Sequence, residues 1–152
     1  SMRGMMSAVE DLDAFLDALM VDEDVLPEQV VLFGFSQGTM MSLHVAPRRE
    51  DAVAGIVAFS GRLLNPEALA EEARVKPPVL LVHGDEDDVV PVDALPQAVG
   101  GLEAVGIIAR HHSCPGLGHG LDDAGVRHGM DFLADIFGVD LQAMAAETPP
   151  GI

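Results

Sequence analysis

A serine between two glycines is the feature of this sequence that most directly predicts chemistry. The pentapeptide Gly34-Phe35-Ser36-Gln37-Gly38 fits the pattern G-x-S-x-G. The apolar run 30–33 precedes it and a helix is predicted over residues 39–46, so the serine lies on a sharp strand-to-helix turn that exposes its hydroxyl for nucleophilic attack. The start of that helix offers free N–H groups, and we predict that the Gln37 N–H stabilises an oxyanion. A plain glycine-rich turn explains the pentapeptide alone, but its flanking elements favour a nucleophile.

A run of acidic residues follows another apolar segment. The sequence from His83 to Pro91 reads HGDEDDVVP, directly after the run 79–82. A carboxylate at the end of a strand can accept a hydrogen bond from an imidazole and fix its tautomer. Four acids compete for this role, at positions 85 to 88, and the others are expected in a solvated loop. A cation site is a rival interpretation, but the loop lacks the Asp-x-Asp-x-Asp-Gly spacing, so no metal or other cofactor is predicted.

The chain has six histidines that could act as the base. His119 is the candidate that lies in a shaped loop, CPGLGHG, after the run 107–113. The others are predicted within helices or strands, or, for His83, at a strand end hydrogen-bonded to the acidic loop; they are His44, His83, His111, His112 and His128. Serine, acid and histidine in this chain order form a nucleophile, an orienting acid and a base.

These groups require a scaffold of alternating strands and helices. Short apolar runs predict strands buried on both faces, and longer stripes of apolar residues predict helices. The predicted strands are 30–33, 53–59, 79–82 and 107–113, and the predicted helices are 2–20, 39–46, 66–73, 93–105 and 122–137. This order is typical of an α/β fold with about four parallel strands and flanking helices. We predict one domain over residues 1–138 and a C-terminal tail over 139–152, frayed at Pro149-Pro150-Gly151.

Composition narrows the classes of partner. The chain has 152 residues, 25 of them acidic and 8 basic, for a formal net charge of −17. Such a surface repels phosphate backbones, so nucleic acid is not an expected partner. No apolar stretch is long enough to insert into a membrane. The single cysteine, Cys114, is expected to be a partly buried structural thiol, and its isolation is compatible with the predicted cytoplasmic location.

Together these segments resemble the phospholipase/carboxylesterase family of α/β-hydrolases, which includes the acyl-protein thioesterases. The segment GFSQGTMM around Ser36 is similar to that family's nucleophile turn, and GLGHG around His119 is similar to its histidine loop. In the family's H-G-x-x-D-x-x-V-P pattern the catalytic acid is the fifth residue, which is Asp87 here. The resemblance implies a Ser36-Asp87-His119 triad that hydrolyses small carboxylic esters or thioesters without a cofactor.

The sequence also departs from that family. Its members begin with several more strands, and a His-Gly loop among them gives a second oxyanion N–H; no His-Gly element precedes Ser36 here. We therefore expect the C-terminal portion of the fold, with impaired catalysis. The alternative is an inactive half-domain that needs an N-terminal partner. The run 30–33 is then an exposed sheet edge, which predicts self-association into a homo-oligomer.

Overall fold

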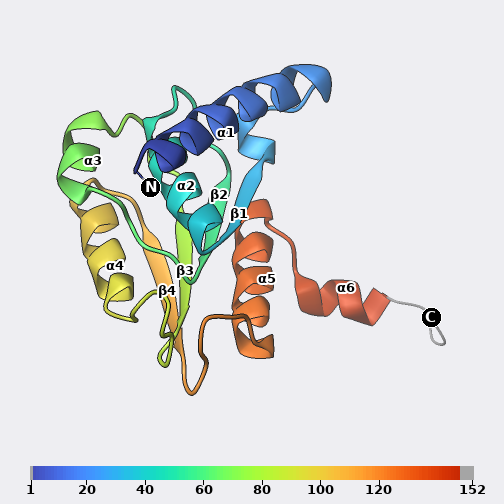
Figure 1. The fold of residues 1–152 in the computed structure, drawn as a ribbon. Helices are drawn as coiled ribbons and strands as arrows, with labels where there is room; N and C mark the ends of the chain where they lie inside the picture. Colours follow the sequence, from blue (N-terminus) through green and yellow to red (C-terminus); the bar gives the residue numbers. More distant parts are fainter. Residues whose placement is uncertain (1, 148–152) are drawn as a thin grey trace.

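Four parallel strands form the centre of the protein. The computed structural model describes residues 2–147. The strands are β1 (Val31–Phe35), β2 (Gly55–Phe59), β3 (Val79–Gly84) and β4 (Ala109–Cys114), and they lie side by side in the order β1-β2-β3-β4 (Figure 1). Each strand is connected to the next by helical segments, as parallel pairing requires. The predicted α/β class with four parallel strands is confirmed.

The two central strands are the most apolar because helices cover both of their faces. Every residue of β2 and of β3 is buried, whereas the edge strands β1 and β4 include exposed residues. In register, Phe35 pairs with Phe59, Phe59 pairs with Val82, and Gly84 pairs with Cys114. The carboxyl ends of all four strands therefore lie along one edge of the sheet, where the predicted site residues follow.

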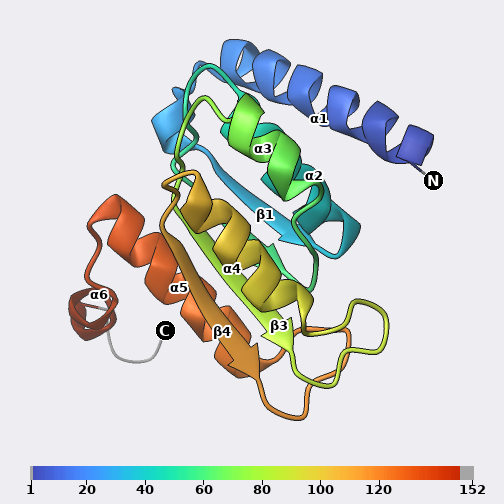
Figure 2. The same cartoon turned by 90° about the vertical axis from the view of Figure 1, so that its left-hand side faces the viewer.

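Helices cover the two faces of the sheet unequally. On one face lie α1 (Met2–Asp22), α2 (Gln37–Val45), α3 (Pro66–Glu72) and α4 (Ala94–Ala104), over a core that includes Leu16, Leu43, Ile56, Leu69 and Leu102 (Figure 2). The other face carries α5 (Asp123–Phe137), whose Phe132 packs with Val57, Phe59 and Leu80. This face is open over β1, where the Phe33 side chain remains 59% exposed.

Every predicted strand and helix forms, with its ends within two residues of the predicted positions. For example, β1 continues through Gly34 and Phe35, because its pairing with β2 extends to the residue before Ser36. Two short 3-10 helices, Pro27–Gln29 and Ala46–Arg48, form in addition, although Ala46 was expected to end the preceding helix. The segment predicted as a tail holds α6 (Leu141–Glu147), where the Asp140 carboxylate accepts hydrogen bonds from the N–H groups of Gln142 and Ala143. Pro149-Pro150-Gly151 lies outside the described residues.

Between residues 2 and 147, no helix combines the length and the apolar character needed to cross a bilayer.

Candidate active site

Ser36 occupies a strained turn between β1 and α2. Its backbone has φ 54° and ψ −111°, a conformation that non-glycine residues rarely adopt and that costs on the order of 1–3 kcal/mol. The turn is held because the Ser36 N–H donates to the Phe59 carbonyl at 2.9 Å. Glycine is needed at position 34, where an added Cβ would lie 2.6 Å from the Thr39 nitrogen. At Gly38 an added Cβ would meet nothing within 4 Å, so the turn does not sterically require glycine at this position.

The next strand end braces this turn from the side. Thr39 is buried, and its hydroxyl donates to the same Phe59 carbonyl at 2.7 Å. Gly61, which comes two residues after β2, packs tightly against the turn. A Cβ added at Gly61 would lie 2.8 Å from the Ser36 carbonyl oxygen. The helix start and the end of β2 therefore fix the Ser36 backbone jointly, a role of Thr39 that sequence reasoning did not identify.

Asp87 is the acid that folds inward from the acidic loop. Its side chain is fully buried, and Oδ1 accepts hydrogen bonds from the N–H groups of Val89 and Val90, both at 2.9 Å. Burial raises the pKa of Asp87, but hydrogen bonds from His119 and from these two N–H groups outweigh it, so the net pKa lies below its ordinary value. Asp87 is therefore ionised at neutral pH. Its neighbours Asp85, Glu86 and Asp88 are exposed.

His119 connects the acid to the serine. Its Nδ1 lies 2.8 Å from Asp87 Oδ2, and its Nε2 lies 3.1 Å from Ser36 Oγ. A carboxylate can only accept, so Nδ1 carries the proton and Nε2 is free to accept the serine hydroxyl proton. The Phe35 ring, 4.9 Å from the imidazole between centroids, packs beside it. The structure thus brings Ser36, Asp87 and His119 into one hydrogen-bonded chain.

The loops that carry the acid and the histidine are tied to each other. The Gly116 N–H donates to the Asp85 carboxylate at 2.8 Å, and the Glu86 N–H donates to the Leu117 carbonyl at 2.9 Å. The loops approach so closely at Gly84 that an added Cβ would clash with the Leu117 carbonyl oxygen. Asp85, one of the four competing acids, therefore supports the histidine loop.

Gln37 is the first residue of α2, beside Ser36. N–H groups at this position have no acceptor within their helix, and they lie at the positive end of its dipole. This placement is compatible with the oxyanion donor that the sequence predicted.

With the exception of His83, which lies against Asp87, the remaining histidines and the cysteine lie apart from this chain of hydrogen bonds. His44 is on α2, His111 and His112 are on β4, and His128 on α5 stacks against His112 with ring centroids 3.9 Å apart. Burial and the nearby Arg48 lower the pKa of His44. Cys114 is fully buried; burial, followed by the charge of Asp122, raises the pKa of its thiol to about 11.

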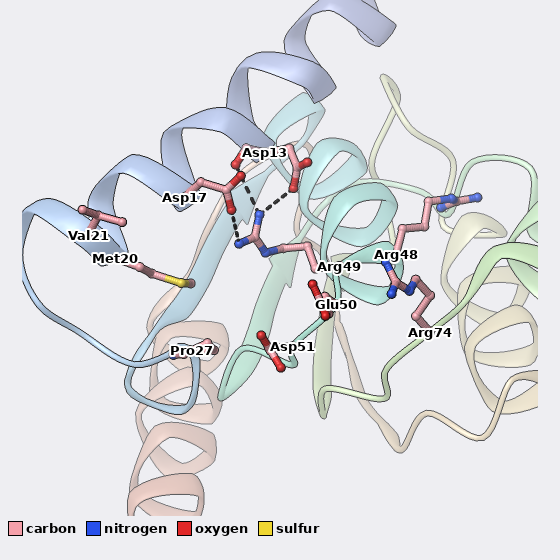
Figure 3. A pocket seen from close by; sticks show the side chains of 10 residues that line it. All are labelled: Asp13, Asp17, Met20, Val21, Pro27, Arg48, Arg49, Glu50, Asp51 and Arg74. Atoms are coloured by element: carbon pink, nitrogen blue, oxygen red, sulfur yellow. Dashed lines mark hydrogen bonds and ion pairs between the residues drawn. The ribbon is translucent and has the colours of Figure 1, made fainter.

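A pocket of about 520 Å³ lies at the opposite edge of the sheet, near the amino ends of the strands. In it, Arg49 is ion-paired with Asp13 and Asp17 of α1 (Figure 3). The pocket contains no residue of the Ser36 site, and its principal cation is already neutralised. No cluster of three or more metal-ligating side chains was found within residues 2–147.

Comparison with known proteins identifies the family. Residues 1–136 match the Phospholipase/Carboxylesterase family. The chain belongs to this family. Acyl-protein thioesterase 1 of Gibberella zeae is 33% identical over 104 residues, which are 65% of this chain and 44% of that protein. A probable carboxylesterase of Oryza sativa subsp. japonica is 33% identical over 122 residues, which are 78% of this chain and 45% of that protein.

Solved structures of other proteins share the fold. The crystal structure of esterase PE8 superposes with a TM-score of 0.85 at 42% identity, covering 88% of this chain and 62% of PE8. The crystal structure of Arabidopsis thaliana SOBER1 superposes with a TM-score of 0.80 at 24% identity, covering 88% of this chain and 64% of that structure, and shows likeness of fold alone. The chain spans less than half the length of the Gibberella and Oryza relatives. The chain shares the α/β-hydrolase fold of these structures.

Proposed function

We propose that this phospholipase/carboxylesterase member hydrolyses carboxylic esters or thioesters through Ser36, His119 and Asp87. The observation that carries the proposal is the hydrogen-bonded chain from Asp87 Oδ2 through the imidazole to Ser36 Oγ, with distances of 2.8 and 3.1 Å. This series of hydrogen bonds contains an ionised acid, a base of fixed tautomer and a hydroxyl on a strained turn. Acyl transfer requires these three groups in this order.

The reaction proceeds in two steps. Ser36 Oγ attacks the carbonyl carbon while His119 Nε2 takes the hydroxyl proton, and Asp87 stabilises the imidazolium that forms. The imidazolium then protonates the leaving alcohol or thiol, and an acyl-serine remains. Water, deprotonated by His119, then attacks the acyl-serine. As the bond between the acyl carbon and Ser36 Oγ breaks, the imidazolium returns the proton to Oγ and the carboxylic acid is released. No metal or organic cofactor takes part in these steps.

The oxyanion of each tetrahedral intermediate binds at the start of α2. The Gln37 N–H is the donor that the described residues offer beside Ser36. Loss of one donor from an oxyanion site reduces the rate about a hundred- to a thousandfold. We expect the Gln37 N–H to contribute an acceleration of this size to the proposed hydrolysis.

The surface around Ser36 favours an apolar acyl group. Phe35 is 41% exposed and packs beside the imidazole. Its ring offers apolar area to a small or medium acyl chain. The names of the Gibberella and Oryza relatives, a thioesterase and a carboxylesterase, agree with a thioester or ester bond as the target.

A fluorophosphonate probe tests the proposal. We expect a single covalent adduct by intact mass on the wild-type chain and none on Ser36→Ala. Ser60→Ala is the matched control, because Ser60 is a neighbouring buried serine outside the triad, and it is expected to remain reactive. An unlabelled wild-type chain, or equal labelling of Ser36→Ala, would refute the assignment of Ser36 as an activated nucleophile.

The exposed edge of β1 favours a second candidate function. Among residues 2–147 this strand pairs only with β2, and its Phe33 lies 59% exposed on the face where α5 leaves β1 uncovered. An unpaired edge with adjacent apolar surface is a template for strand pairing. We propose that the chain forms a homo-oligomer through β1. The related alternative is an inactive half-domain that requires an N-terminal partner.

Light scattering at several micromolar concentrations tests this second candidate. We expect the wild type to form dimers or larger species, and Phe33→Glu to shift them to monomers because a charge cannot be buried cheaply in such an interface. Val21→Glu makes the same charge change on an 80% exposed side chain of α1 and is expected to leave assembly unchanged. A wild-type monomer throughout the range contradicts self-association. The half-domain alternative is supported if the chain alone is not labelled by the fluorophosphonate probe and becomes labelled when the N-terminal half of a family member is added.

A further inference from the structure

The buried histidine at the end of β3 contacts the acid of the proposed triad. His83 is 2% exposed, and its Nε2 lies 2.8 Å from the Val90 carbonyl oxygen and 3.4 Å from Asp87 Oδ2. Both of these oxygens are acceptors, so Nε2 must carry a proton. His83 therefore presents one N–H to the turn that holds Asp87 and to the carboxylate oxygen that also binds His119.

The arrangement leaves Asp87 with little freedom. Its Oδ1 is occupied by the N–H groups of Val89 and Val90, and its Oδ2 lies between His119 Nδ1 and the His83 N–H. The His83 N–H donates to the carbonyl oxygen of Val90, and the N–H of the same Val90 donates to Asp87 Oδ1. The His83 bond therefore holds the residue that holds the Asp87 carboxylate. A rotation of the carboxylate would break bonds on both oxygens.

We propose that His83 is a positioning residue that aims Asp87 Oδ2 at His119. It acts through the turn 87–90 and does not touch the reacting atoms. The inference rests on the proposed function of the triad, but the hydrogen bonds themselves can be examined without catalysis. If His83 is removed, the carboxylate keeps its charge and loses one of the bonds that fix its direction.

The first test uses the wild-type chain and needs no variant. The ¹⁵N shifts of the imidazole nitrogens report which nitrogen of His83 carries the proton. We expect a protonated Nε2. An unprotonated Nε2 would overturn the proposal, because it could donate neither to Val90 nor to Asp87.

The second test compares two substitutions that differ in one donor. His83→Gln keeps an N–H near the position of Nε2, and His83→Phe keeps the ring volume without a donor. We expect His83→Phe to reduce the rate of fluorophosphonate labelling by about tenfold to a hundredfold. That is the loss typical when hydrogen-bond partners that orient metal-binding residues are removed, and such partners likewise act through another residue. We expect His83→Gln to restore most of that rate, and ester KM to change little in either variant. Equal rates in His83→Phe and the wild type, with both folded by circular dichroism, would overturn the proposal.

A third readout separates this proposal from the proposed function. The Nδ1 proton of His119 resonates far downfield when it is strongly bonded to Asp87. We expect that resonance in the wild type and in His83→Gln, and its loss or upfield movement in His83→Phe. This outcome without any probe labelling would refute the hydrolase and retain the positioning role. An unchanged resonance in His83→Phe would refute the positioning role, whatever the labelling.

Discussion

Replacing Asp87 by asparagine changes one atom in the hydrogen-bonded chain and should reverse the tautomer of His119. Oδ1 of Asp87 accepts two backbone N–H groups, which only an oxygen can do, so the amide oxygen of the variant must take that position. The amide nitrogen then replaces Oδ2, 2.8 Å from His119 Nδ1. Because that nitrogen donates, Nδ1 must accept and the imidazole proton moves to Nε2.

A protonated Nε2 faces Ser36 Oγ at 3.1 Å and cannot take its proton. In triads of this kind the same substitution lowers the rate about 10⁴-fold with the geometry intact. At about 1.36 kcal/mol for each factor of ten, this corresponds to about 5.4 kcal/mol of the activation barrier. We therefore expect the second-order rate constant for fluorophosphonate labelling of Asp87→Asn to fall by about four orders of magnitude.

Asp88→Asn is the matched control, because it removes the same charge from the neighbouring exposed residue. We expect its labelling rate to remain within a few-fold of the wild type. The reasoning would be refuted by an Asp87→Asn chain that is folded by circular dichroism and labels within tenfold of the wild type. An equal loss in Asp88→Asn would show that net charge near the loop, and not the tautomer, controls the reactivity of Ser36.

Three further predictions concern the scaffold. Gly34→Ala should lower the free energy of unfolding by about 3 kcal/mol or more in urea titrations, because its Cβ would overlap the α2 backbone. Gly38→Ala should raise the free energy of unfolding by about 0.5–1 kcal/mol, because alanine favours the helix in which Gly38 lies. A smaller loss of stability in Gly34→Ala than in Gly38→Ala would contradict this. Cys114 is buried, and the pKa of its thiol is raised to about 11. We expect iodoacetamide to leave Cys114 unmodified in the native chain and to alkylate it after denaturation, as measured by intact mass. Alkylation of the native chain would show that the Cys114 thiol is not buried. The pKa of Asp87 is lower in the folded chain than in the unfolded chain, where it is about 3.9. The ionised carboxylate therefore stabilises the fold above that pH, and this stabilisation is lost as the pH falls through the folded-state pKa. Asp87→Asn should lose less unfolding free energy on acidification than the wild type, and equal losses would contradict the lowered pKa.

The sequence by itself determined the α/β class and the positions of its four strands. Apolar runs that alternate with amphipathic stretches have few compact arrangements, and the all-buried β2 and β3 are the outcome that such runs require. The sequence also indicates Ser36, Asp87 and His119 as candidates, because each lies in the turn or loop that follows a strand and the carboxyl ends of parallel strands meet at one edge. Only the family resemblance distinguishes Asp87 from its three acidic neighbours.

The directions of the site side chains and the contacts between distant segments follow only from the folded structure, because the spacing of residues along the sequence does not specify them. Whether Asp85 or Asp87 turns inward depends on the backbone N–H groups that each carboxylate meets, and these are set by the turn 87–90 and by the histidine loop more than thirty residues away. The bond of His83 to Val90 and the different needs for glycine at positions 34 and 38 are likewise consequences of close packing between distant segments. Local patterns determine which elements form, whereas directions of side chains and clearances of a few tenths of an ångström exist only once those elements are packed together.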